Sequence, residues 1–303
     1  MRSVLCTLAF CALSALAVPA QAALFNQTGT FGTSDLSSPF GISADGQGTA
    51  FVIDMGPNFS VSTVKVFDSS HTLVNTLGSG TLLGSAGVVA APNGTLYVGD
   101  SSRIVPMSKS GTPGTPFGTL DGPYGITADA VSNIFVADAF NNRILSFSSA
   151  GAPRLTLSSA NGINFSHPMG VAVDASHIYV ADTFHDRVAL FDTAGNYQSS
   201  FSTNISALVP TWPDFHPKEL AIAPDGTIFM SLGDPGFAAF SPSGQLLDTF
   251  GGLDRASGVA LSGNTLYGVE LGTHLVHVFA VPEPATLSML GMSLLLVLRR
   301  RRA

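Results

Sequence analysis

The sequence contains few charged residues, since lysine, arginine, aspartate and glutamate make up 11% of its 303 residues. About a quarter is usual for a soluble domain. Disordered chains, coiled coils and nucleic-acid-binding domains are rich in charge, so this composition argues against all three. The 32 glycines and 18 prolines follow no G-X-Y period, which excludes collagen.

Cysteine is also scarce, and both cysteines lie near the start of the chain. Cys6 and Cys11 fall in an apolar run that begins after Arg2 and ends before an A-x-A cleavage site at residues 20–22. This order predicts a secretory signal peptide over residues 1–22 that is removed on export. The mature protein would then lack cysteine, so its core must be stable without disulfides.

The end of the chain carries a second segment of unusual composition. Pro282, Glu283 and Pro284 precede an apolar stretch over residues 287–298, and four arginines follow at 299–302. A comfortable membrane-spanning helix needs ~20 apolar residues, so this stretch is short for a permanent anchor. Arginines beyond it would stay cytoplasmic. The pattern predicts transient membrane contact with the body of the protein outside.

This tail, VPEPATLSMLGMSLLLVLRRRR, resembles the PEP-CTERM sorting signal of bacterial exported proteins. The resemblance implies an exosortase-type membrane protease as partner, cleavage near Pro-Glu-Pro, and delivery to the cell surface or extracellular matrix. Ala285 stands where the family usually has serine, a minor departure. We therefore expect residues 281–303 to be a sorting segment.

The body between these ends is acidic. Residues 23–281 contain 8 basic and 19 acidic side chains, a formal net charge of −11. This charge argues against nucleic acid or an anionic membrane surface as a partner, because both repel an acidic protein.

The body consists of repeats. A phrase with a glycine followed by alternating apolar residues recurs six times, and its glycine column reads Gly41, Gly87, Gly125, Gly170, Glu219 and Gly258. The intervals run from 38 to 49 residues, close to the length of a four-stranded propeller blade. Three further apolar runs with turn residues between them complete most repeats, which is the pattern of four short strands.

The sixth repeat lacks its fourth run. The N-terminal Thr30-Phe31-Gly32 copies Thr249-Phe250-Gly251, which ends the fifth repeat. We therefore predict an all-β, six-bladed β-propeller of four-stranded blades over residues 23–280, with the ring closed by the N-terminal strand. Closure in this way removes an exposed sheet edge.

The repeats resemble the NHL family of β-propellers, most clearly in PYGITADAVSNIFVADAFNNRILSF and PMGVAVDASHIYVADTFHDRVALFD. The family pattern has an aspartate after the second strand and an Asn-x-Arg phrase before the third. The residues that match it here are Asp100 with Arg103, Asp138 with Arg143, and Asp182 with Arg187. Because the pair recurs, we interpret it as structural: it ties the loop between the second and third strands.

The resemblance also implies that the first strand of each blade lines a central channel. The residue before the repeat glycine would then lie near one channel mouth. This column contains the candidate ligand-binding residues Phe40, Tyr124, Met169, Lys218 and Ser257, with Ala86 in the second repeat. Two aromatic rings, a cation and small residues suit a sugar or a peptide.

A metal site is the alternative. Related propeller lyases and lactonases hold a divalent metal in the channel. His167 and His216 precede the prolines of two repeats, and Glu219 replaces a repeat glycine. Imidazole and carboxylate groups are metal ligands, so the three residues would bind an ion such as Zn²⁺ or Ca²⁺ if they converged.

Two functions therefore remain open at this point. The first, which needs no cofactor, is an exported surface or matrix protein whose propeller binds or scaffolds a protein or an exopolysaccharide. The second is a metal-dependent lyase or lactonase-like hydrolase with its site in the channel. No HExxH motif or nucleophile elbow occurs in the sequence, and no residue pattern identifies a substrate.

Overall fold

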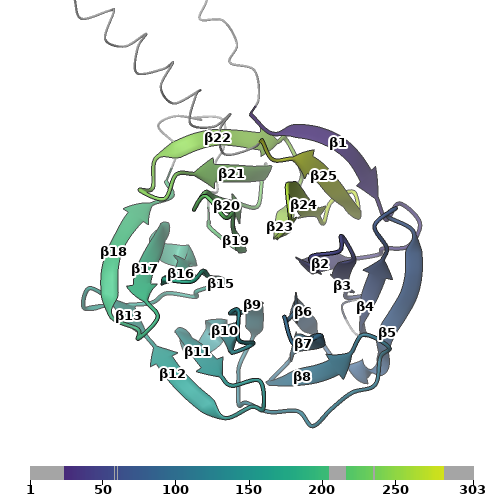
Figure 1. The fold of residues 1–303 in the computed structure, drawn as a ribbon, viewed down its shortest axis with the longest axis horizontal. Helices are drawn as coiled ribbons and strands as arrows, with labels where there is room; N and C mark the ends of the chain where they lie inside the picture. The colour runs from purple at the N-terminus through teal and green to yellow at the C-terminus, as the bar shows by residue number, and fades with distance from the viewer. Residues whose placement is uncertain (1–23, 58, 60, 205–215, 235, 283–303) are drawn as a thin grey trace, which may run out of the picture.

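The strands of the chain form a closed ring of six sheets (Figure 1). This computed structural model describes residues 24–57, 59, 61–204, 216–234 and 236–282. The predicted signal peptide and residues 283–303 of the sorting segment lie outside the described residues. Within the described ranges no helix is long and apolar enough to cross a membrane. The predicted all-β, six-bladed propeller is confirmed.

The first three blades follow one another in chain order. Blade 1 contains β2 (Pro39–Ala44), β3 (Ala50–Asp54), β4 (Ser62–Phe67) and β5 (Leu73–Leu82). Blade 2 contains β6 (Ser85–Ala90), β7 (Thr95–Asp100) and β8 (Arg103–Ser108). Blade 3 contains β9 (Pro123–Ala128), β10 (Ile134–Asp138), the 3-10 turn η1 (Ala139–Asn141), β11 (Arg143–Phe147) and β12 (Pro153–Leu157).

The remaining blades repeat this plan. A small hairpin of β13 (Ser159–Ala160) and β14 (Ile163–Asn164) leads into blade 4. Blade 4 contains β15 (Gly170–Val173), β16 (His177–Asp182), the 3-10 turn η2 (Thr183–His185), β17 (Arg187–Asp192) and β18 (Tyr197–Ser202). Blade 5 contains β19 (Leu220–Ile222), β20 (Ile228–Ser231), β21 (Gly236–Phe240) and β22 (Leu246–Gly251). Blade 6 contains β23 (Ala256–Ser262), β24 (Thr265–Glu270), β25 (Leu275–Ala280) and β1 (Asn26–Phe31).

Blade 2 departs from the predicted four strands. Its sheet contains three strands, and residues 113–117 take the outer place through two isolated bridges, Ile104 to Phe117 and Met107 to Pro113. Pro113 and Pro116 in this segment lack backbone N–H groups, so a regular ladder cannot form along it.

Large apolar side chains fill the spaces between neighbouring blades. One apolar residue near the end of each third strand is at most 4% exposed: Phe67, Met107, Phe147, Phe191, Phe240 and Phe279. Each belongs to one of six core clusters that together run around the ring. The core is therefore a ring of wedges between blades, and it contains no disulfide.

The glycine column allows the inner strands to approach one another. A Cβ atom added to Gly170 would lie 2.0 Å from the carbonyl oxygen of Lys218 in the next blade. The other four column glycines meet the next blade's carbonyl in the same way, at 2.0 to 2.7 Å. Any side chain there would push two blades apart, so the column has a steric cause.

The N-terminal strand closes the ring as predicted. β1 pairs antiparallel with β25, from Asn26 opposite Ala280 to Phe31 opposite Val276. Phe31 is 5% exposed and packs against Phe67 of blade 1 and Tyr267 of blade 6. One side chain of β1 thus joins the first complete blade to the last.

We predict that Phe31→Ala lowers the free energy of unfolding by about 3 to 5 kcal/mol, because it leaves a cavity between two blades. Chemical denaturation of the full chain in detergent measures this change. Thr30→Ala, an exposed position on the same strand, is the matched control and should cost less than about 1 kcal/mol. Equal effects of the two substitutions would contradict closure by the Phe31 side chain.

Candidate functional site at the channel mouth

The antiparallel order of each blade defines two faces of the ring. The inner strands begin, and the second strands end, on one face, which we call the mouth face. The loops that enter each blade and those between the second and third strands gather there. The turns between the first and second strands lie on the opposite face. The candidate site residues therefore share one face with the aspartate–arginine pairs.

A buried carboxylate at the end of the second strand anchors the mouth loops in five blades. Each accepts a backbone N–H from the loop that enters its own blade, 16 or 17 residues earlier in the chain. These residues are Asp54, Asp100, Asp138, Asp182 and Glu270, all at most 4% exposed. We call them the carboxylate anchors. Buried loop N–H groups need acceptors, and these carboxylates supply them.

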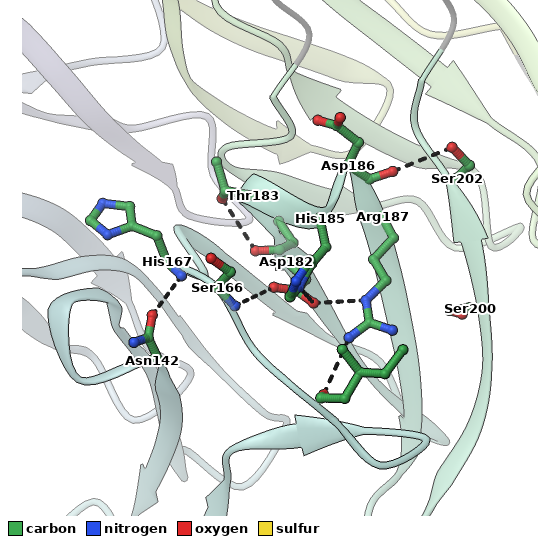
Figure 2. A network of polar contacts seen from close by, with 12 residues as sticks. Asn142, Ser166, His167, Asp182, Thr183, His185, Asp186, Arg187, Ser200 and Ser202 are labelled. Carbon is green, nitrogen blue, oxygen red and sulfur yellow. Dashed lines mark hydrogen bonds and ion pairs between the residues drawn. The ribbon is translucent and has the colours of Figure 1, made fainter.

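Three anchors also form the aspartate–arginine pairs found in the sequence. Arg143 Nε donates to Asp138 Oδ2 at 2.7 Å and Arg187 Nε donates to Asp182 Oδ2 at 2.7 Å. The pair of Arg103 and Asp100 is longer, at 3.3 Å. Figure 2 shows the Asp182 carboxylate between Ser166 N and Arg187, with His185 as a further partner at 3.0 Å. Asp100, Asp138 and Asp182 thus each contact the incoming loop as well as the loop between the second and third strands.

The neighbouring polar residues of these motifs have other partners. Asn141 donates to Asp138, but Asn142 accepts a hydrogen bond from His167 N at 2.7 Å across the blade boundary. Asp186 lies 2.9 Å from His216 Nδ1 and does not join Asp182. Asn142 and Asp186 have the left-handed backbone that ends η1 and η2, which asparagine and aspartate tolerate better than most residues.

Two of the predicted mouth residues meet across a blade. The rings of Phe40 and Tyr124 lie 5.7 Å apart, although blade 2 separates their own blades. Blade 2 contributes Ala86 at this position, and its small side chain leaves the rings room to meet. Burial raises the pKa of the Tyr124 hydroxyl, so the phenol stays protonated.

The other predicted mouth residues differ in exposure. Ser257 is 3% exposed and its hydroxyl donates to Phe40 O at 3.0 Å, so it supports the wall of the mouth. Met169 is half-buried, and its carbonyl accepts Gly125 N at 2.8 Å. Burial lowers the pKa of Lys218, while Asp234 opposes this shift and Arg255 adds to it.

Sequence reasoning missed two aromatic residues at the mouth face. Phe140 and Phe184 are 54% and 58% exposed, and they occupy the same position in η1 and η2. The shared spacing in DAFNNR and DTFHDR, two residues after the anchor, is the signal that could have identified them. The 3-10 turn places each ring outside the core.

These residues join Phe40, Tyr124 and two histidines in a continuous series. Successive ring centroids lie 5.0 to 6.2 Å apart, within the range that favours aromatic contact. The series, which we call the aromatic arc, contains Phe40, Tyr124, Phe140, His167, Phe184 and His216. A groove of about 440 Å³ borders it, lined by Ser101, Asp121 and Phe59 together with the first three arc residues.

The structure does not bring the three predicted metal ligands together. The Phe184 ring contacts both histidines, stacking on His167 at 5.0 Å and meeting His216 edge-on at 5.7 Å. Figure 2 shows the His167 ring lying away from the Asp182 cluster. Glu219 faces the channel, and the described residues contain no group of three histidine, cysteine, aspartate or glutamate side chains suited to a metal ion. This donor set does not fit the proposed ion.

Glu219 lies instead in the channel wall, where the contact between blades 5 and 6 differs from the contacts between the other blades. The channel cavity of about 210 Å³ is lined by the six inner strands, and Glu219 is the one titratable residue on it in the described part of the chain. Burial raises the pKa of Glu219 to about 8, opposed by a hydrogen bond from Val259 N at 3.3 Å. Where other blades have a glycine contact, Ser231 Oγ bridges Glu219 N and Ser257 O.

The C-terminal end of the chain matches a known protein-sorting motif. Residues 280–302 match the PEP-CTERM protein-sorting motif. The motif indicates an exported protein that is processed by a membrane protease. A search of curated protein sequences found no match.

Solved structures of similar fold include several enzymes. A streptogramin B lyase has a TM-score of 0.61 at 12% identity, over 84% of this chain and 97% of the other. Virginiamycin B lyase from Staphylococcus aureus gives 0.62 at 12%, over 85% and 100%. A gluconolactonase from Xanthomonas campestris gives 0.63 at 16%, over 86% and 89%. At these identities the similarity shows the fold alone.

We predict that Asp138→Ala lowers the free energy of unfolding by about 2 to 3 kcal/mol. The substitution leaves the backbone N–H of Asp121 without its acceptor and Arg143 without its carboxylate. Asp138→Asn keeps an acceptor oxygen and should cost less. Denaturant unfolding measures both, and a loss below about 0.5 kcal/mol for Asp138→Ala would show that the anchor is dispensable.

We also predict a pH-dependent contribution from Glu219. Its pKa is about 8 in the folded protein, above the ordinary value of 4.5, so the folded state retains a proton that the unfolded state releases. Stability from this group is therefore present at low pH and falls as the pH rises from 5 to 8, by on the order of 1 kcal/mol per pH unit.

The measurement is the difference in unfolding free energy between the wild-type chain and Glu219→Gln at several pH values. Other titrating groups contribute equally to both proteins and cancel. A difference that stays flat between pH 5 and 8 would contradict a raised pKa.

Proposed function

We propose that this exported protein is a non-enzymatic binding or scaffold module of the cell surface or extracellular matrix, with its ligand site on the mouth face. The repeats are of the NHL type in this proposal, because the aspartate–arginine phrase occurs in the anchor positions. After export, an exosortase-type protease cleaves the tail near the Pro282-Glu283-Pro284 motif, and the propeller remains outside the cell.

One observation supports the mouth face most strongly. Exposed aromatic rings border a groove there, together with a few polar groups such as Asp121, Ser101 and the Tyr124 hydroxyl. Apolar surfaces with a few placed polar groups are typical of ligand sites. The carboxylate anchors hold the surrounding loops, so the site is formed before a ligand arrives.

A second candidate function is a lyase or lactonase-like hydrolase acting in the channel. The names of the structural neighbours and the carboxyl of Glu219 in the channel favour it, since a carboxyl with a pKa near 8 can donate a proton at neutral pH. The metal-dependent form of this proposal lacks a converging ligand set among the described residues. We therefore prefer the binding module.

The test of the proposal is cosedimentation of the purified full chain, in mild detergent, with extracellular matrix isolated from a bacterium that makes it. We expect the wild-type chain to sediment with the matrix and Phe40→Ala/Tyr124→Ala to do so at least fivefold less.

Val131→Ala, a 76% exposed position in the turn between β9 and β10 on the opposite face, is the matched control and should bind like wild type. Failure of the wild-type chain to sediment would overturn the proposed function.

A further inference from the structure

We infer that the aromatic arc binds a polysaccharide of neutral pyranose sugars, with successive sugar rings stacked on successive aromatic rings. The inference rests on the proposed function and names its ligand class. It depends on the exposure, support, spacing and charge of the arc residues.

The exposure of the arc is unusual for large apolar side chains. Phe140 and Phe184 are more than half exposed, and burial of either ring against a ligand would stabilise the complex. Scattered apolar residues on a surface are ordinary, but a contiguous group points to a binding surface. The rings of the arc touch one another in order, so the exposed area is continuous across several blades.

The exposed rings are held in place before any ligand binds. Phe140 lies against Gly122, where an added Cβ would come within 2.4 Å of the ring. Phe184 stacks on His167 with an interplanar angle of 11°, and the backbone of His167 is fixed by Asn142. Burial lowers the pKa of His167, which favours the neutral imidazole at pH 7. Preorganised rings lose little conformational entropy on binding.

The arrangement of the rings fits a chain rather than a single small molecule. The arc runs from Phe40 of blade 1 past blades 3 and 4 to His216 at the start of blade 5, without closing into a pocket. A ligand that covers it must present flat apolar faces repeatedly. Pyranose rings offer such C–H faces at each unit of a polysaccharide, and aromatic rings provide the complementary surface.

Charge and hydrogen-bonding groups favour neutral sugars. Asp121 lines the groove beside Phe40 and Phe140, and the carboxylate of Asp186 is 33% exposed beside His216. Carboxylates accept hydrogen bonds from sugar hydroxyl groups but repel anionic ligands. The net charge of −11 on residues 23–281 adds to this repulsion. An extended peptide would instead require donors for its carbonyl groups, which the carboxylates do not provide.

The experiment is affinity electrophoresis of the full chain in native detergent gels. The gels contain hydroxyethyl cellulose, a neutral β-glucan, soluble starch, a neutral α-glucan, or alginate, a polyanion. We expect retardation by at least one neutral polysaccharide and none by alginate. Phe140→Ala and Phe184→Ala should each weaken binding by about tenfold, and the double variant should abolish retardation.

Controls separate binding from folding. Phe184→Tyr keeps a ring and should retain binding, and Val131→Ala should behave as wild type. Because both phenylalanines are mostly exposed, the double variant should keep the melting temperature of the wild-type chain.

Retardation by neither neutral gel, retardation by alginate alone, or unchanged retardation of the double variant would each overturn the inference. The matrix assay distinguishes this failure from that of the proposed function. Cosedimentation that survives Phe140→Ala/Phe184→Ala and is lost when the matrix is treated with protease means a protein ligand. The binding module then stands and the polysaccharide assignment fails.

Discussion

The hydrogen bond from a loop N–H to a buried carboxylate is the interaction on which the mouth face depends. Among the described residues it occurs in five of six blades, twice in blade 1, and the carboxylate always lies at the end of the second strand. The loop that it fixes precedes the inner strand, and the turn beside it carries the exposed side chain. The same structural hydrogen bond is thus repeated around the ring, and it positions loops whose exposed side chains differ from blade to blade.

Blade 5 shows what happens where this interaction is missing. It has Leu232 where the other blades have a carboxylate, and it also has Glu219 in place of the column glycine. Its inner strand is the shortest, at three residues, and the Ser231 hydroxyl donates a hydrogen bond to Ser257 O of blade 6. Blade 5 thus lacks both the carboxylate anchor and the column glycine, and a side-chain hydrogen bond replaces the close backbone contact there.

Much of the fold could be predicted from the sequence because, within a blade, most strands pair with their neighbour in the chain. The glycine column indicated the inner strands, because these strands approach too closely for a side chain. The copied Thr-Phe-Gly phrase indicated the closing strand, although its partner β25 lies at the other end of the chain. Blade 2 was harder, since its prolines prevent a regular outer strand and leave bridges only.

The site was less predictable because its residues meet across blades. Phe40 reaches Tyr124 because Ala86 in the blade between them is small. His167 stacks on Phe184 because a turn in another repeat places the Phe184 ring beside it. Ser257 and the three expected metal ligands have the right residue types, but neighbours that the sequence does not reveal engage or separate them. The position of a residue within a repeat predicts which strand or loop of the blade it occupies. Its side-chain contacts depend on the adjacent repeats.

The closing strand has a consequence for the order of assembly during export. A chain that crosses a membrane from its N-terminus delivers β1 first and its partner β25 last, about 250 residues later in the pairing. Until then β1 is an unpaired strand, and the blade that needs it does not yet exist on the far side of the membrane. The exposed residues of β1, Asn26 to Thr30, are polar or glycine, so the waiting segment offers little apolar surface to other emerging chains.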